Sequence, residues 1–236
     1  MKKQNNLELE FKSCFYSTRL LNKIFHLNKT STQQIDISQI NKAIYYARKY
    51  HGNQIRQTGE PYYSHPLEVA YMVANYTATI IPELFQTYML ITPILHDTIE
   101  DTELTEKLIA EGFGYKIANQ VESLSRNKKD KKISSEEILN ILAASRKYDT
   151  IIIKFFDRID NLQTLGIKSP EKAQKIIDET RNSFIPLAAQ LNMPVIERQL
   201  KSLCNRYLAK NHSLLQNFPM AIFEDNFHPC LSLFHS

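Results

Sequence analysis

The chain has 236 residues, of which 43% are hydrophobic and 23% are charged, a composition typical of globular proteins rather than of disordered or fibrous ones. Only 5 glycines and no tryptophan occur, which disfavours a glycine-rich phosphate loop and a many-stranded β fold. The net charge of +4 is spread along the chain and is too small to indicate a nucleic-acid-binding protein. We therefore expect an all-α protein without a nucleic-acid partner.

Cysteine usage and hydropathy indicate the compartment. Cys14, Cys204 and Cys230 are widely spaced and odd in number, so they form neither a disulfide framework nor a paired zinc motif. The most apolar stretch, residues 79–95, contains Glu83 and two prolines and is shorter than the roughly 20 apolar residues needed to cross a bilayer. The start of the chain lacks the apolar core of a signal peptide. These features predict a cytoplasmic protein without a membrane partner.

The beginning of the chain differs from the rest in its patterning. A short mixed segment at 20–27 is followed by a polar stretch at 28–34 without helical or strand period, so we expect residues 1–34 to form an N-terminal extension. The main domain is expected to cover residues 35–210. Its first helix is predicted to be capped by Asp36 or Ser38 and to end near residues 51–52, because apolar residues recur at three-and-four spacing between them.

Helical periodicity continues along the main domain. A helix is expected to start at Pro66, and another to run over 82–97 with a kink at Pro93. Further helices are predicted at 116–126, 134–147, 149–165, 170–191 and 195–208. The sequence therefore predicts a bundle of about eight or more helices, followed by a tail at 211–236 whose packing the pattern does not indicate. The basic run 126–132 fits a solvated interhelical loop or, alternatively, a rim that attracts an anionic ligand.

One short segment after an apolar helix is rich in ionisable groups. His96, Asp97, Glu100 and Asp101 lie within six consecutive positions. Buried carboxylates are costly unless they are paired or bound to a cation. The segment therefore indicates a metal site or a proton-handling site, whereas the simpler alternative is a helix end with its acids in solvent.

Two further segments supply potential ligands. His65 precedes the helix that starts at Pro66, and Asp157 interrupts the strongly apolar run at 151–162. Together with His96 and Asp97 they form a set of two imidazoles and two carboxylates. Such a mixed nitrogen and oxygen set suits a borderline divalent ion such as Mn²⁺, Fe²⁺ or Zn²⁺.

The three segments resemble, in order, the motifs of the HD-domain hydrolases, and specifically of the RelA/SpoT alarmone hydrolase branch. The family's Gly-Glu-Pro-Tyr…His-Pro motif matches 59–66, its Leu-His-Asp…Glu-Asp-Thr motif matches 95–102, and its Lys…Asp-Arg…Asn…Thr-Leu motif matches 154–165. Residues 179–191 are similar to a further family helix. The resemblance covers residues 36–210 and implies an HD-domain helical bundle.

The resemblance also implies an activity and a site. The activity is hydrolysis of the 3′-pyrophosphate of guanosine tetra- or pentaphosphate, which gives GDP or GTP and pyrophosphate. By resemblance, Mn²⁺ or another divalent transition metal is held by His65, His96, Asp97 and Asp157. Glu100 and Asp101 are implied as catalytic groups that orient water or move protons, and the nucleotide contacts are implied to be Arg56, Asn161 and Thr164.

Some positions depart from the family pattern. Gln57 stands where bacterial relatives often carry Lys, and Asp160 stands where they often carry His. Two other functions therefore stay open: hydrolysis of another nucleotide or dinucleotide phosphate, and alarmone binding without turnover. The family's bifunctional enzymes continue into a synthetase domain for which this chain has no room, so we expect a small hydrolase without synthetase activity. The sequence does not indicate an oligomeric state.

Overall fold

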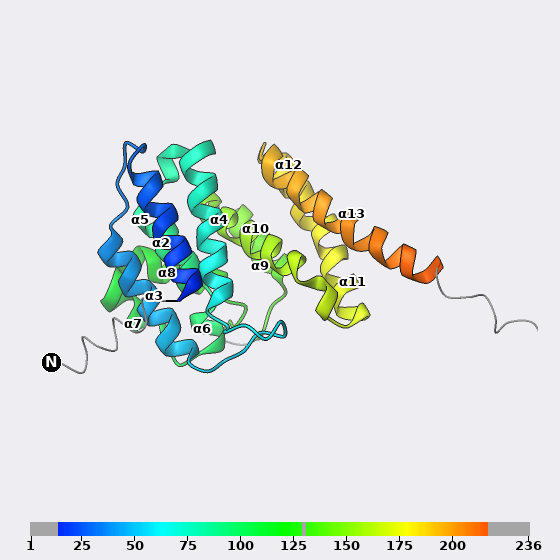
Figure 1. Ribbon diagram of the computed structural model, residues 1–236, viewed down its shortest axis with the longest axis horizontal. Coiled ribbons are helices and arrows are strands. Elements are labelled where there is room, and N and C mark those ends of the chain that lie inside the picture. Colours follow the sequence, from blue (N-terminus) through cyan, green and yellow to red (C-terminus); the bar gives the residue numbers. More distant parts are fainter. Residues whose placement is uncertain (1–13, 129–130, 217–236) are drawn as a thin grey trace, which may run out of the picture.

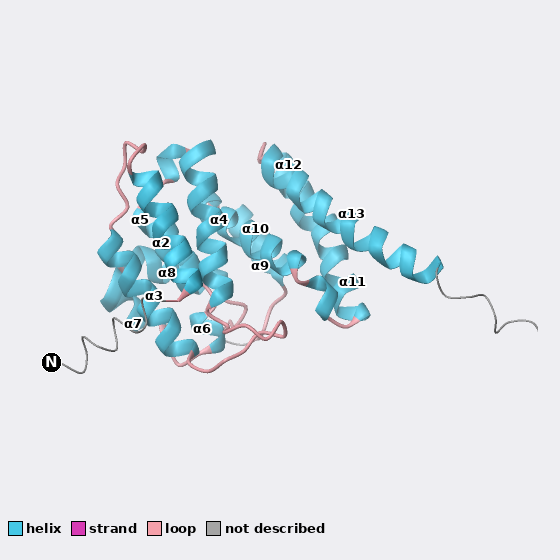
Figure 2. Cartoon of the chain, in the orientation of Figure 1, coloured by secondary structure: helices cyan, strands magenta, loops and turns pink. Residues whose placement is uncertain are grey.

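The computed structural model describes residues 14–128 and 131–216, and within these ranges every regular element is a helix (Figures 1 and 2). The all-α prediction is therefore confirmed. Cys230 and most of the expected C-terminal tail lie outside the described residues. Among the described helices, none is long and apolar enough to span a membrane.

The first helices are α2 (Phe15–Asn28), α3 (Ile37–His51) and α4 (Ser64–Ile80). The predicted start of α3 is confirmed, because the Asp36 carboxylate accepts hydrogen bonds from the backbone N–H groups of Ser38 and Gln39. The helix ends where Gly52 adopts a φ of 51°, a left-handed conformation that glycine tolerates without steric cost. Pro66 lies in the first turn of α4, as expected.

The predicted helix over 82–97 is divided in the structure. It consists of the 3-10 turn η1 (Pro82–Leu84), α5 (Thr87–Leu95) and the single turn α6 (Thr98–Asp101). Helix α7 (Glu106–Phe113), which we did not predict, is capped by the Thr105 hydroxyl and leads through Gly114 to α8 (Tyr115–Leu124). Breaks at both ends of α5 leave His96 and Asp97 in a short connection between helices.

The second half of the chain begins with α9 (Ser135–Ala144) and α10 (Tyr148–Gln163), followed by the 3-10 turn η2 (Leu165–Ile167). The predicted helix over 170–191 is interrupted: α11 (Pro170–Glu179) passes through the π-helical turn η3 (Thr180–Phe184) into α12 (Ile185–Gln190). Helix α13 (Pro194–Gln216) continues beyond its predicted end at residue 208. The first residues of the expected tail, 211–216, are thus helical.

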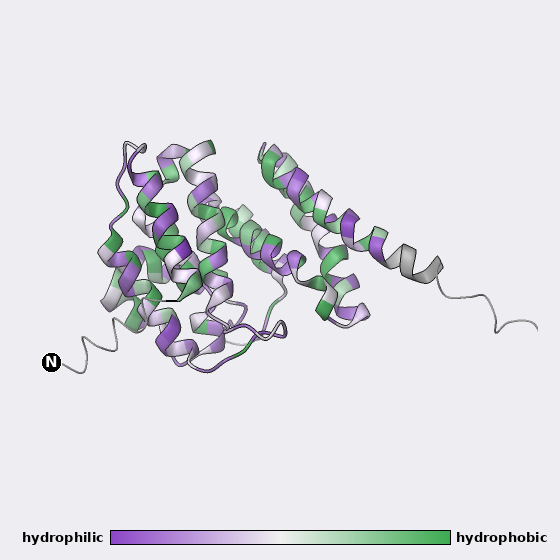
Figure 3. Cartoon of the chain, in the orientation of Figure 1, coloured by the Kyte–Doolittle hydropathy of each residue, from purple (hydrophilic) through white to green (hydrophobic). Residues whose placement is uncertain are grey.

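Helix α10 lies at the centre of the bundle, with α4 on one side and α13 on the other (Figure 1). Aromatic contacts mark two of the interfaces of α10, since Phe156 packs edge-to-face against Tyr76 of α4 and Phe155 packs edge-to-face against Phe184 of η3. Green apolar and purple polar residues alternate around most helices (Figure 3), the pattern expected when one face of each helix is buried. The central position of α10 places its polar side chains between the two halves of the molecule.

Helix α2 is part of this bundle, although we expected residues 1–34 to be an extension. Leu20 and Ile24 have no exposed surface and belong to the same core as the main-domain helices. Helix α2 packs on α4, and Arg19 forms an ion pair with Glu68 of α4. The polar stretch 28–34 that suggested a linker is a short connection between two packed helices, so the edge of the core does not fall at residue 34.

A core substitution tests the contribution of α2. We expect Leu20→Ala to lower the free energy of unfolding by about 2–5 kcal/mol, because the side chain is fully buried and its loss leaves a cavity. Urea denaturation followed by circular dichroism measures the change. Phe25→Ala on the same helix is the control, since Phe25 is 57% exposed and should cost far less. Equal, small effects of the two substitutions would show that α2 contributes little to the core.

Candidate active site

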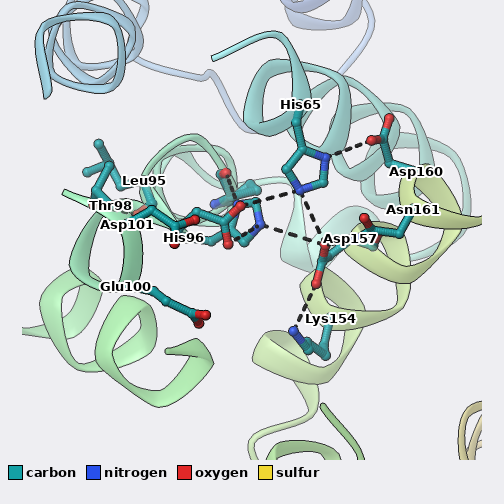
Figure 4. Close-up of polar contacts among 12 residues, drawn as sticks. His65, Leu95, His96, Thr98, Glu100, Asp101, Lys154, Asp157, Asp160 and Asn161 are labelled. Carbon is teal, nitrogen blue, oxygen red and sulfur yellow. Dashed lines mark hydrogen bonds and ion pairs between the residues drawn. The ribbon is translucent and has the colours of Figure 1, made fainter. Parts of the chain in front are cut away.

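Three helices bring the predicted metal ligands together. His65 lies in the first turn of α4, His96 directly follows α5, and Asp157 lies in the middle of α10. One ligand atom from each of these buried residues lies within 4.8 Å of the other two. Figure 4 shows the two imidazole rings and the Asp157 carboxylate converging. Segments separated by up to 92 positions in sequence thus meet at one point, as the motif pattern predicted.

Asp97 completes the four-residue set. Its Oδ1 atom lies 3.1 Å from His96 Nε2, and its Oδ2 atom lies 3.5 Å from His65 Nε2. On the opposite side, Asp157 Oδ1 lies 3.3 Å from His65 Nε2 and 3.9 Å from His96 Nε2. The two Nε2 atoms, the Asp97 oxygens and Asp157 Oδ1 therefore face a common space.

The opposite side of each ligand is held by another group. His65 Nδ1 lies 2.7 Å from Asp160 Oδ2, and Asp157 Oδ2 accepts a 2.8 Å bond from Lys154 Nζ. The Pro93 carbonyl lies 2.8 Å from His96 Nδ1 and accepts a hydrogen bond from that ring N–H. Pro93, at which we expected a kink, thus orients the ring through its carbonyl. All three contacts leave the remaining ligand atom directed at the common space.

The chemistry of the donor set fits a divalent cation. His96 Nε2 is buried and has no hydrogen-bond partner among the described residues, although Asp97 is close. A buried unpaired nitrogen is costly unless something binds it. Two imidazole nitrogens and two carboxylates are suitable ligands for a borderline divalent metal, so His65, His96, Asp97 and Asp157 would hold it.

Close contacts among these buried groups shift their pKa values. Burial lowers the pKa of His65, but hydrogen bonds to Asp157 and Asp160 and the charge of Asp97 outweigh it and raise this pKa to about 10. Burial raises the pKa of Asp157, yet Lys154 and the two histidines hold it well below its usual value. In the absence of a cation His65 is therefore protonated at neutral pH. Cation binding must release that proton, so the affinity is expected to rise with pH.

The loop between α3 and α4 carries Arg56 to the site. Its backbone folds back on itself, because Arg56 N–H donates to the Glu60 carbonyl and Gly59 adopts a φ of 89° at the tip. Gln54 ties the loop to α6 through the Asp101 carbonyl. The Arg56 guanidinium donates to Asp160 Oδ2 at 2.7 Å, which places this predicted nucleotide contact beside the candidate metal ligands.

The two predicted catalytic carboxylates have different surroundings. Burial raises the pKa of Glu100, but Arg126 and Lys132 outweigh it, so this pKa is lowered overall. The pKa of Asp101 is raised by burial and by the neighbouring charge of Asp97, although a 2.9 Å bond from the Tyr62 hydroxyl opposes the shift. The same hydroxyl lies 2.9 Å from Asp97 Oδ2, so its single proton can be shared between the two carboxylates. Asp101 is thus linked to Asp97 through Tyr62. Glu100 is instead held by Arg126 and Lys132.

A cavity of about 930 Å³ contains these groups. Its lining includes all the predicted site residues except His96, and Asn161 and Thr164 lie along the same face of α10 as Asp157. Basic residues from three segments also line it: Arg126, Lys132, Lys154, Lys168, Lys172 and Lys175. The second interpretation of the run at 126–132, a rim of the site, agrees with this position. A cavity with this lining favours a polyanionic ligand.

The HD-domain family profile matches residues 43–193, which is more than half of the chain. The chain belongs to the HD-domain family. The match contains the His65, His96–Asp97 and Asp157 segments, and it lies within the range 35–210 that we expected for the domain. The helical bundle and the paired imidazoles and carboxylates described above are consistent with this membership.

Individual relatives point to one branch of the family. The chain is 35% identical over 215 residues to "GTP pyrophosphokinase rsh" of Brucella ovis, and 37% identical over 186 residues to "Guanosine-3′,5′-bis(diphosphate) 3′-pyrophosphohydrolase" of Aquifex aeolicus. These alignments cover 79% and 76% of this chain but only 27% and 25% of the relatives. The chain thus spans about a quarter of the length of these curated relatives.

A solved structure supports the fold. It is described as "A metazoan ortholog of SpoT hydrolyzes ppGpp and plays a role in starvation responses", and it aligns with a TM-score of 0.55 at 20% identity. The alignment covers 74% of this chain and 98% of that one. At this identity the likeness shows a shared fold.

Sequence reasoning missed several residues that orient the site. Tyr62 lies within the first motif but had no assigned role, and Lys154 lies within the third. The spacing of Lys154 and Asp157, three positions apart on one helix, could have indicated their ion pair. Asp160 had been noted only as a departure from the family, and no local pattern indicates that it meets Arg56 and His65.

A substitution at His96, whose Nε2 has no hydrogen-bond partner among the described residues, tests the candidate metal ligands. We expect wild-type protein to bind one Mn²⁺ per chain and His96→Gln to lose tight binding, because a ligand with a fixed Nε2 is removed. Metal content after dialysis and calorimetric titration measure both. His26→Gln, on the exposed side of α2, is the control and should bind as wild type. Undiminished binding by His96→Gln would exclude His96 as a ligand.

Proposed function

We propose that this chain hydrolyses the 3′-pyrophosphate of guanosine tetra- or pentaphosphate and releases GDP or GTP and pyrophosphate. The observation that carries the proposal is the convergence of two imidazoles and two carboxylates beside a cavity lined by basic side chains. The named function of the Aquifex aeolicus relative supports the choice of substrate. We further propose Mn²⁺ as the cofactor, with another divalent transition metal as the alternative.

The cation, when bound, would lower the pKa of water and offset the charge of the phosphate oxygens. His65 and His96 present Nε2, because their Nδ1 atoms are fixed by Asp160 and by the Pro93 carbonyl. Asn161 donates to Asp157 Oδ1 at 2.7 Å and also lines the cavity. It is therefore proposed to contact the nucleotide while it is bonded to a proposed metal ligand. Arg56 and Thr164 line the cavity beside it and are proposed to contact the nucleotide.

Asp101 and Glu100 are proposed to have different roles in the reaction. The raised pKa of Asp101 makes it the better proton carrier, since a catalytic acid or base works best near the operating pH. Glu100 stays ionised because its pKa is lowered. It is proposed to orient the attacking water while it holds Arg126 at the rim of the cavity.

A substrate panel tests the function. Wild-type protein with Mn²⁺ is expected to release pyrophosphate from guanosine tetraphosphate, and excess chelator should abolish turnover. Mg²⁺ should restore less activity than Mn²⁺, because Mg²⁺ prefers oxygen ligands. The assay resolves products by ion-exchange chromatography. Full activity in excess chelator would refute the proposed metal dependence.

The same panel separates the alternatives. Faster turnover of an adenosine or dinucleotide phosphate would favour another substrate, and tight binding of guanosine tetraphosphate without turnover would favour a non-catalytic domain. We also propose that this chain makes no alarmone. Transfer of pyrophosphate from ATP to GDP by the purified protein would contradict that expectation.

Two isosteric substitutions separate the proposed metal ligand Asp97 from the proposed water-orienting residue Glu100. Asp97→Asn is expected to lose both bound metal and turnover, because it removes an anionic ligand. Glu100→Gln is expected to keep its metal while kcat falls by ~10²- to 10⁴-fold, the usual contribution of a positioned acid or base. Metal analysis and steady-state kinetics measure both variants.

Glu122→Gln is the matched control, since Glu122 also pairs with a lysine of the 126–132 loop but lies outside the cavity lining. It should retain wild-type kcat. A Glu100→Gln variant whose KM rises at unchanged kcat would show that Glu100 only anchors the basic rim.

A further inference from the structure

Asp160 accepts two hydrogen bonds at one oxygen atom. Its Oδ2 lies 2.7 Å from His65 Nδ1 and 2.7 Å from the Arg56 guanidinium. The residue is only 4% exposed. A buried carboxylate is stable when its charge is paired and its oxygens are hydrogen-bonded, and here the partners come from α4 and from the loop that precedes it.

The contact with His65 decides which nitrogen of that ring can bind a cation. An imidazole that donates through Nδ1 presents Nε2 as its free donor atom. His65 Nε2 faces the carboxylates of Asp97 and Asp157 at 3.5 and 3.3 Å. Carboxylates that accept from a metal-binding histidine fix its ring and raise its basicity, and their loss usually weakens metal binding.

The contact with Arg56 decides where the guanidinium lies. Arg56 is carried by a loop, and its side chain is 12% exposed at the wall of the cavity. Asp160 holds it on α10, one turn from Asp157 and beside Asn161. The arginine and the metal ligand His65 are therefore fixed by the same carboxylate oxygen (Figure 4 shows the His65 contact).

A carboxylate is well suited to this arrangement. One carboxylate oxygen carries two lone pairs and can accept two bonds at once, and its charge pairs with the Arg56 guanidinium. An aspartate that served only to neutralise Arg56 would not need to contact His65. The double contact is thus the feature that distinguishes positioning from simple charge pairing.

We propose that Asp160 is a positioning residue that holds His65 in its metal-binding orientation and Arg56 in its ligand-binding orientation, so that one side chain couples the two subsites. The Arg56 half rests on the proposed function, because it assumes a nucleotide in the cavity. The His65 half requires only that the site binds a divalent cation.

Titration with Mn²⁺ alone tests the His65 half. Asp160→Asn keeps the size of the side chain but removes its charge, and it is expected to weaken Mn²⁺ binding by about 10- to 100-fold. Asp149→Asn is the matched control, because it makes the same change at the other end of α10, where Asp149 accepts from Gln120. It should bind Mn²⁺ as wild type. Wild-type affinity in a folded Asp160→Asn protein would overturn the proposal.

Nuclear magnetic resonance of the wild-type protein keeps the test decisive if Asp160→Asn does not fold. In ¹⁵N-labelled protein loaded with diamagnetic Zn²⁺, His65 should show an Nδ1–H proton protected from exchange, assigned through its Overhauser contacts. A ring that carries no such proton would overturn the proposal regardless of the variants.

A double-mutant cycle tests the Arg56 half at saturating Mn²⁺. Arg56→Gln and Asp160→Asn should each raise the KM for guanosine tetraphosphate, and the double variant should be no worse than Arg56→Gln, because Asp160 acts on the nucleotide through Arg56. Independent, multiplicative effects on KM would refute the coupling. If wild-type protein turns over no nucleotide, the proposed function fails while the Mn²⁺ titration still decides the role of Asp160.

Discussion

Charges buried along α10 determine how the bundle is assembled around the site. Lys154, Asp157, Arg158 and Asp160 are each less than 8% exposed, and an unpaired charge removed from water is strongly destabilising. Each finds its partner: Lys154 pairs with Asp157 inside the helix, Arg158 with Glu179 of α11, and Asp160 with groups of the α3–α4 loop and α4. The positions of α4 and α11 relative to α10 therefore depend on charge pairing as well as on apolar packing.

Two of these pairs also orient the candidate metal ligands Asp157 and His65. Because Lys154 occupies one oxygen of Asp157 and Asp160 occupies one nitrogen of His65, the remaining atoms are directed into a common space without further rearrangement. Preorganisation of this kind reduces the cost of binding a cation. Structural stability and metal affinity thus depend on overlapping contacts. Substitutions at Lys154 or Asp160 should affect both.

The sequence predicted most of the helices and the convergence of four candidate metal ligands, since both leave local signals. Apolar spacing and the Asp36 cap located α3, and three ordered motifs located His65, His96, Asp97 and Asp157. Helix α2 was missed because its neighbouring polar stretch resembles a linker, and only tertiary burial of Leu20 shows that it is packed. The contact between Arg56 and Asp160 joins positions 104 residues apart, and no periodicity encodes such a meeting.

The π-helical turn at Thr180–Phe184 has a geometric consequence for Arg158. This guanidinium pairs with Glu179 Oε2 at 2.8 Å and also lies 4.1 Å from the centre of the Phe184 ring. In a regular α-helix two residues five positions apart point about 140° away from each other, at 100° per residue. The wide turn, in which Ile185 N–H bonds to the Thr180 carbonyl, brings both side chains to one side. The Glu179 carboxylate and the Phe184 ring can thereby contact the same arginine from a single stretch of helix. In an uninterrupted α-helix the two side chains would point in different directions.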